Sequence, residues 1–179
     1  MGGDKFTSLI EAILFYETEG VSYEKLMRIT NLDKDKILDI VNELNLDYQK
    51  ALHGINIAEV AGGFTFQIKK DIFPEIRDIY NIRGKSKLSQ SALTVLSIIA
   101  YKQPITKGEI EAIRGVSADN QVRNLIEKGL IEIVGRKEAF GKPLLYGTTK
   151  EFLKYFNLKS IKDLPEINEL KSDEYSDDE

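Results

Sequence analysis

The sequence predicts a mainly α-helical chain with small β-hairpins, an α+β arrangement of two tandem winged-helix domains. The pattern of apolar residues occurs twice along the chain, and each copy has the spacing of three helices followed by two short strands. This order of elements is typical of the winged helix, a variant of the helix-turn-helix. With 179 residues, 42% of them hydrophobic, the chain is long enough for two small cores.

A shift of 84 residues aligns the first copy with the second, so that the segment from Val21 to Val41 falls on the segment from Ile105 to Leu125. Apolar positions coincide, whereas polar positions do not, as expected for two copies of one core. The coinciding pairs are Val21 and Ile105, Ser22 and Thr106, Leu26 and Ile110, Ile29 and Ile113, Leu38 and Val122, and Val41 and Leu125.

The first copy begins with an amphipathic helix, since apolar residues between Phe6 and Leu14 recur at the spacing of one helix face. Ser22 and Asp33 are expected to cap the second and third helices, because their side chains can accept hydrogen bonds from free N–H groups. In the second helix, Leu26 and Ile29 are expected to face the core.

Residues 55–60 and 64–68 are predicted to form the first hairpin, with Ala61-Gly62-Gly63 as its turn. Phe64 and Phe66 alternate with polar residues and so share one face of their strand. A further helix over residues 71–80 is expected to close this domain.

The second copy repeats the same elements. Residues 91–101 are apolar on most sides and are expected to form the most buried helix. Thr106 with Glu109 has the spacing of a capping box, as does Thr148 with Glu151 before a closing helix over residues 150–156. Ser117 is expected to cap the helix that Gly129 ends. Residues 130–135 and 143–147 are expected to form the second hairpin.

These elements predict a division of the chain into four segments. Residues 1–80 are expected to form the N-terminal winged-helix domain, residues 81–90 a polar linker, and residues 91–164 the C-terminal winged-helix domain. Residues 165–179 carry an excess of acidic side chains and are expected to be a disordered acidic tail.

Composition and motifs argue against several classes of protein. The chain has no cysteine and one histidine, His53, which argues against disulfides, thiolate zinc sites and a Ser-His-Asp triad. No signal peptide and no apolar run long enough to span a membrane is present. Gly-rich phosphate loops and other catalytic motifs are also missing. We therefore expect a cytoplasmic protein without cofactor, metal, catalytic residues or membrane partner.

The sequence resembles the family of segregation and condensation protein B, ScpB, from Phe6 to Leu164. The resemblance depends on "IAYKQPIT", "AIRGV" and "GKPLLYGTT" in this order, and on "EAILFYETEGVS" and "EVAGGFTFQIK" in the first copy. It implies a non-enzymatic subunit of the bacterial SMC condensin complex, associated with the nucleoid and acting in chromosome condensation and segregation during cell division.

The resemblance also implies the partners. The family forms a homodimer, mainly through the first domain, and binds the kleisin ScpA, largely through the second; the kleisin connects it to the SMC ATPase. We expect the dimer contact at the first hairpin, with Val60, Phe64 and Phe66. The kleisin contact is expected at the second wing, with Arg136, Phe140, Lys142 and Tyr146.

A winged-helix DNA-binding transcriptional regulator is the alternative. Residues 86–162 carry a net charge of +6, and Arg136, Lys137 and Lys142 lie in a loop that resembles a DNA-binding wing. However, the third helix of the first copy is rich in Asp and Glu and would be repelled by phosphates. DNA contact is therefore expected to be indirect or weak.

Overall fold

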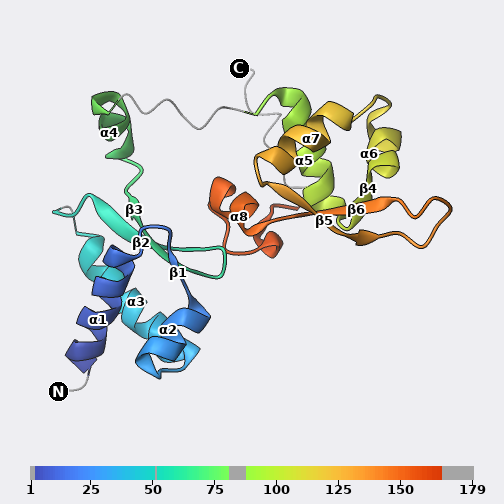
Figure 1. Ribbon diagram of the computed structural model, residues 1–179. Helices are drawn as coiled ribbons and strands as arrows, with labels where there is room; N and C mark the ends of the chain where they lie inside the picture. Colours follow the sequence, from blue (N-terminus) through green and yellow to red (C-terminus); the bar gives the residue numbers. More distant parts are fainter. Residues whose placement is uncertain (1–2, 51, 81–87, 167–179) are drawn as a thin grey trace.

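The computed structural model describes residues 3–50, 52–80 and 88–166. The described elements form two groups, shown in blue to green and in green to red in Figure 1. In the first group they are α1 (Gly3–Tyr16), β1 (Val21–Ser22), α2 (Tyr23–Thr30), α3 (Lys34–Tyr48), β2 (Ile55–Val60), β3 (Gly63–Ile68) and α4 (Phe73–Ile79). In the second group they are α5 (Gln90–Lys102), β4 (Ile105–Thr106), α6 (Lys107–Arg114), α7 (Asp119–Glu127), β5 (Ile131–Arg136), β6 (Leu144–Thr148), α8 (Lys150–Phe156) and a 3-10 turn (Ile161–Asp163).

Each group contains one three-stranded antiparallel sheet, with the strand orders β1-β3-β2 and β4-β6-β5. The predicted fold class is confirmed: helices are combined with small antiparallel sheets, and three helices precede each hairpin. The strands β1 and β4 were not predicted, because two residues are too few to show the alternation of a strand.

Each group has its own core of buried side chains. The first core is formed by residues from Ile10 to Phe64 in the sequence, and the second by residues from Leu88 to Phe152. The two cores reflect the sequence repeat, because Leu26 and Ile110, which are equivalent in the two copies, are both fully buried. The expectation that Ile29 faces the core is wrong, because its side chain is 46% exposed. Thr30 occupies the buried face of α2 instead, one turn after Leu26, and donates its hydroxyl to the Leu26 carbonyl at 2.8 Å.

Three predicted helix caps are confirmed. Ser22 and Asp33 accept N–H groups at the starts of α2 and α3, and Thr106 with Glu109 forms the reciprocal capping box of α6. Gly129 follows α7 with a φ of 68°, a left-handed conformation that glycine adopts without steric cost.

Two predicted caps are shifted by one residue. The N-cap of α7 is Ala118 rather than Ser117, and α7 has no side-chain cap. The N-cap of α8 is Thr149, which accepts the N–H of Phe152, whereas Thr148 is the last residue of β6 and contacts Gln103.

The predicted linker and tail lie mostly outside the described residues, at 81–87 and 167–179. Leu88 and Ser89 belong structurally to the second domain, because Leu88 is buried in its core and Ser89 caps α5. At the other boundary, the carbonyl of Pro165 accepts the hydroxyl of Tyr101 at 2.7 Å. Among the described helices, none combines the length and the hydropathy needed to cross a membrane.

Candidate partner-binding surfaces

The second wing, the loop between β5 and β6, turns its basic side chains back onto its own domain. Arg136 donates from Nη1 to the Lys142 carbonyl at 3.2 Å, which closes the loop on itself. Lys137 donates from Nζ to Oε1 of Glu109 in α6 at 2.5 Å. Two of the three basic residues that suggested DNA binding therefore already have partners within the domain.

Glu109 joins this wing to the start of α6. Its carboxylate accepts hydrogen bonds from Lys137 and from the N–H and hydroxyl of Thr106. The contact with Lys137, followed by those with Thr106, lowers the pKa of Glu109 to about 2. The carboxylate is thus charged at neutral pH and offsets the positive charge of the wing.

Phe140 is the most exposed predicted site residue. It lies in the loop between β5 and β6, and its side chain is fully solvent-exposed. Lys142, two residues later, has a φ of 41°, in the left-handed region. The loop therefore presents an aromatic ring beside a lysine, a combination that suits contact with another protein better than with phosphates alone.

Tyr146 and Phe64 occupy the same position in the two copies. Phe64 in β3 pairs with Val21 in β1, and Tyr146 in β6 pairs with Ile105 in β4. Both side chains are buried, with exposed fractions of 4% and 8%. The structure therefore places both residues in the cores of their own domains, where neither offers a large surface to a partner.

The other predicted dimer residues are half-buried. Phe66 packs on Tyr48 of α3 with ring centroids 5.3 Å apart, and Val60 lies at the end of β2 next to the second domain. The structure does not bring Val60, Phe64 and Phe66 together on one free surface, because Phe64 and Phe66 face the helices of their own domain.

The first hairpin instead meets the second domain. The N–H groups of Ala61 and Gly62, at its turn, donate to the carbonyls of Leu158 and Lys159 at 3.0 and 3.2 Å. These two residues follow α8, so the first wing is bound to the segment directly after the closing helix of the second domain. Figure 1 shows the tip of the β2–β3 hairpin beside α8.

Side chains strengthen this contact between the domains. Lys159 forms an ion pair with Glu59 at 3.0 Å, and Gln67 donates to Asn157 at 2.6 Å. Glu59 also accepts the hydroxyl of Tyr23 at 2.8 Å. Burial tends to raise the pKa of Glu59, but the hydrogen bonds from Tyr23 and Lys159 outweigh it and hold the pKa below its usual value.

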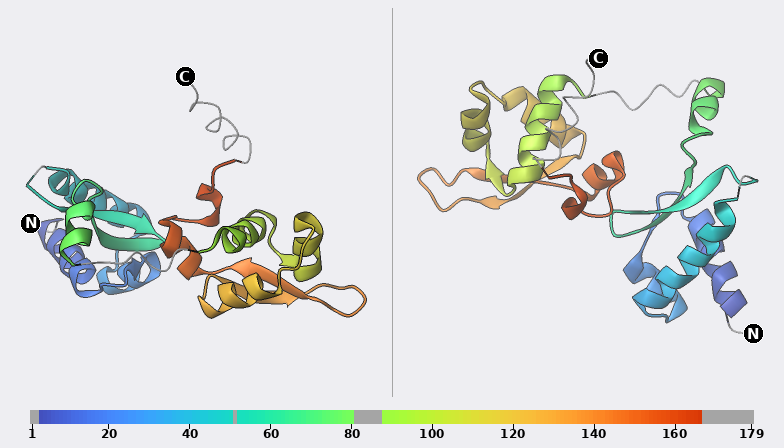
Figure 2. Two further views of the ribbon diagram at one scale, coloured as in Figure 1. Left: turned by 90° about the horizontal axis from the view of Figure 1, so that it is seen from above. Right: turned by 180° about the vertical axis from the view of Figure 1, so that it is seen from behind.

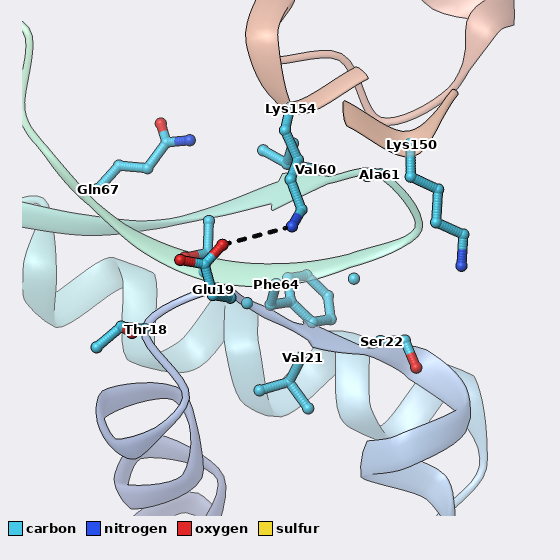
Figure 3. Close-up of a pocket in the computed structure, with 13 residues that line it drawn as sticks. Thr18, Glu19, Val21, Ser22, Val60, Ala61, Phe64, Gln67, Lys150 and Lys154 are labelled. Atoms are coloured by element: carbon cyan, nitrogen blue, oxygen red, sulfur yellow. Dashed lines mark ion pairs between the residues drawn. The ribbon is translucent and has the colours of Figure 1, made fainter. Parts of the chain in front are cut away.

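A pocket of about 360 Å³ lies along the same contact. Figure 3 shows Lys150 and Lys154 reaching from α8 toward the first domain, where Lys154 pairs with Glu19 at 3.7 Å. Phe64 and Val60 contribute apolar surface to the lining. Within residues 3–50, 52–80 and 88–166, no group of three or more His, Asp or Glu side chains could hold a metal ion.

A second groove, of about 500 Å³, lies between α7 and the second wing. Ile126 of α7 and Leu144 of β6 line it with apolar surface, and Arg123 lies among its charged residues. Sequence reasoning did not identify this groove, because its apolar residues come from α7 and β6, which are far apart in the sequence. The spacing of Val122 and Ile126 along one helix was the available signal.

Comparisons with known proteins agree on one family. The model of the family "Segregation and condensation complex subunit ScpB" matches residues 8–167. Segregation and condensation protein B of Brevibacillus brevis is 40% identical over 93% of this chain and 86% of its own length. The protein of that name from Geobacillus thermodenitrificans is 41% identical over 93% of this chain and 80% of its own length.

Two solved structures are also similar to this chain. A conserved hypothetical protein from Chlorobium tepidum is 36% identical, with a TM-score of 0.42, over 87% of this chain and 98% of that one. ScpB from Mycobacterium tuberculosis is 25% identical, with a TM-score of 0.41, over 88% of this chain and 98% of that one.

Proposed function

The chain belongs to the family of segregation and condensation complex subunit ScpB, and on this premise we propose that it is a homodimeric, non-enzymatic subunit that binds the kleisin ScpA. Through the kleisin it would join the SMC ATPase and act in chromosome condensation and segregation at the nucleoid. The observation that carries this proposal is the match of the family model to residues 8–167, which include both domains.

The contacts within the second wing favour a protein partner over DNA as its ligand. A DNA-binding wing needs free cationic side chains to neutralise phosphates. Here Lys137 is paired with Glu109, and Lys107 at the start of α6 is paired with Asp119 of α7. Acidic residues in these positions would repel the DNA backbone from this face.

We place the kleisin contact at the groove between α7 and the second wing. Exposed Phe140 in the wing, with Ile126 and Leu144 in the groove, supplies the apolar surface that an amphipathic helix needs. Arg136 and Lys142 flank the wing and would contact acidic side chains. Tyr146 of β6, whose side chain is buried, would support the groove from within.

Co-purification with the cognate ScpA, alongside DNA anisotropy titrations at two salt concentrations, tests this function. We expect stable co-elution with ScpA and negligible DNA binding near physiological salt. Tight, sequence-dependent DNA binding without co-elution would overturn the proposal in favour of a transcriptional regulator.

The position of the contact needs a separate variant. Exchanging Phe140 and Leu144 for Ser is expected to weaken ScpA binding at least about 10-fold, because apolar anchors of an interface contribute most of its free energy. The matched control exchanges Ile113 and Val116 for Ser; both side chains are exposed on the same domain. Unchanged affinity in the first variant would exclude this groove but not ScpA binding itself.

A further inference from the structure

The pocket between the first hairpin and α8 has one wall that suits an acidic ligand. Lys150 and Lys154 extend from α8 toward the first domain (Figure 3), and Lys150 has no ion pair among the residues that line the pocket. Lys154 pairs with Glu151 of its own helix at 3.2 Å and with Glu19 at 3.7 Å. The Glu19 side chain is 91% exposed, and exposed pairs contribute little free energy. Both lysines can therefore donate to a further carboxylate.

The first domain supplies the other wall of the pocket. Val60 and Phe64 give it apolar surface, while Ser22 and Thr65 add hydroxyl groups. The volume of about 360 Å³ lies within the usual range for a pocket that holds a small ligand or a large side chain. Apolar surface on one side and two cations on the other suit an aromatic side chain with carboxylates beside it.

The chain itself carries a segment of this chemistry. The acidic tail, residues 167–179, has six acidic side chains and one lysine, and its last seven residues read "DEYSDDE", with Tyr175 among the carboxylates. Residues 150–162, which precede it, have four lysines and one glutamate. Acidic segments with few apolar residues do not form a core of their own and become ordered by binding. The charges of the two segments are thus complementary.

The tail is long enough to return to this pocket. Lys159 lies at the contact between the domains, and the described chain ends seven residues later at Glu166, within about 25 Å of it at full extension. Nine further residues lead to Tyr175 and span up to about 30 Å. In both views of Figure 2, α8 lies between the first hairpin and the rest of the second domain, so the tail starts close to the contact that it has to reach.

We propose that the acidic tail binds this pocket in its own chain. Tyr175 packs on the apolar surface of Val60 and Phe64, and the carboxylates beside it accept hydrogen bonds from Lys150 and Lys154. The effective concentration of a short tethered segment is about millimolar, so weak contacts are enough to fill the pocket. The bound tail contacts both domains and acts as a strap that holds them together. This inference goes beyond the proposed function and does not depend on ScpA.

The first test locates the tail in the full chain by NMR. Because the chain has no native cysteine, a nitroxide spin label on Ser176→Cys is the only label in the molecule. We expect it to broaden the amide signals of Val60, Ala61, Lys150 and Lys154. High salt should reduce this broadening, because it screens the attraction between the tail and the lysines. Unchanged signals at these four residues would overturn the proposal.

Charge reversal tests the contacts on α8. Lys150→Glu combined with Lys154→Glu is expected to remove the broadening at Val60 and Ala61, while the other signals of both domains show that the fold is kept. The matched control, Lys36→Glu with Lys50→Glu, makes the same change of net charge at exposed lysines that do not line the pocket. Equal broadening in the α8 variant and the control would overturn the role of the two lysines.

A mixed sample distinguishes the tail of the same chain from that of a second copy. Isotope-labelled chains without the spin label are combined with spin-labelled chains that carry no isotope, so that only contacts between chains cause broadening. We expect none at Val60, Ala61, Lys150 and Lys154. Broadening as strong as in the first test would show that the tail binds another copy and would overturn the strap.

Tyr175→Ser tests the strap without changing any charge. In a chain with one dye on each domain, this variant is expected to lower the efficiency of energy transfer, because the tail no longer holds the domains together. Glu179→Gln, a change at the last residue of the tail, is the control and should leave the efficiency nearly unchanged. Equal transfer in Tyr175→Ser and the wild type would show that the tail does not join the domains.

Discussion

At the residue scale, the charge of Glu109 connects the start of α6 to the second wing. Its carboxylate caps α6 and holds Lys137 of the second wing. Because its pKa in the folded chain, about 2, is lower than its usual value of 4.5, the carboxylate stabilises the fold above the unfolded pKa. This stabilisation is expected to disappear as the pH falls from about 5 to 2.

Glu109→Gln should therefore lower the melting temperature at pH 7 and have a much smaller effect at pH 2, where about half of the folded chains already carry a neutral Glu109. Thermal unfolding followed by circular dichroism across this range checks the prediction. Glu138→Gln, which removes an exposed carboxylate next to Lys137 in the second wing, is the control and should leave the melting temperature at pH 7 nearly unchanged. A difference between wild type and Glu109→Gln that stays constant down to pH 2 would contradict it.

At the element scale, the short strand β1 depends on one glycine. A Cβ at Gly63 would lie 2.2 Å from the carbonyl oxygen of Val21, so β3 can approach β1 only without a side chain there. Gly63→Ala is expected to destabilise the first domain by about 1–3 kcal/mol, the usual range for overpacking. Chemical denaturation measures this effect.

Gly108 offers the matched control. It lies in the first turn of α6, where an added Cβ has open space. Gly108→Ala should be neutral or stabilising by up to about 1 kcal/mol, because alanine loses less backbone entropy in a helix. Equal destabilisation by the two substitutions would contradict the role given to Gly63.

Local signals predicted most elements but not their exact ends. Ser22, Asp33 and Thr106 were identified as caps because a polar side chain there precedes an apolar helical pattern. Thr148 and Thr149 both fit that pattern. Which of them caps α8 depends on Gln103 at the end of α5, because Gln103 forms hydrogen bonds with Thr148 and leaves Thr149 as the cap. A contact between residues so far apart in the sequence cannot be predicted from the residues around the cap.

The candidate sites were harder to predict than the fold. Phe64, Phe66 and Tyr146 have the alternation of strand residues, but alternation does not say which face is covered by the protein's own helices. The exposed face of α4 was also visible as a pattern, since its apolar residues have helical spacing. Only the structure shows that none of them is buried.

At the scale of the whole molecule, the first wing acts as a joint between the domains. Its turn donates two backbone hydrogen bonds, and Glu59 and Gln67 add side-chain contacts. Each hydrogen bond contributes about 0.5–1.5 kcal/mol, and a partly exposed ion pair contributes less than about 1 kcal/mol. A contact of a few kcal/mol in total keeps the domains together and still permits them to separate.

Lys159→Glu should shift this balance toward separated domains, because two carboxylates would then face each other at the joint. Dyes on Asp39→Cys and Glu127→Cys report the distance between domains by energy transfer in the otherwise cysteine-free chain. We expect lower transfer efficiency in Lys159→Glu, with both domains still folded by circular dichroism.

The double variant Glu59→Lys with Lys159→Glu restores opposite charges across the joint and should recover part of the transfer. Lys162→Glu makes the same change of charge at an exposed residue of the 3-10 turn and should leave the efficiency of energy transfer unchanged. High salt should move the wild type toward the single variant, because it screens the attraction between Lys159 and Glu59. If Lys159→Glu transfers as efficiently as the wild type at every salt concentration, the ion pair does not hold the domains, and the joint depends on the remaining contacts, such as the backbone bonds of Ala61 and Gly62 and the bond from Gln67 to Asn157.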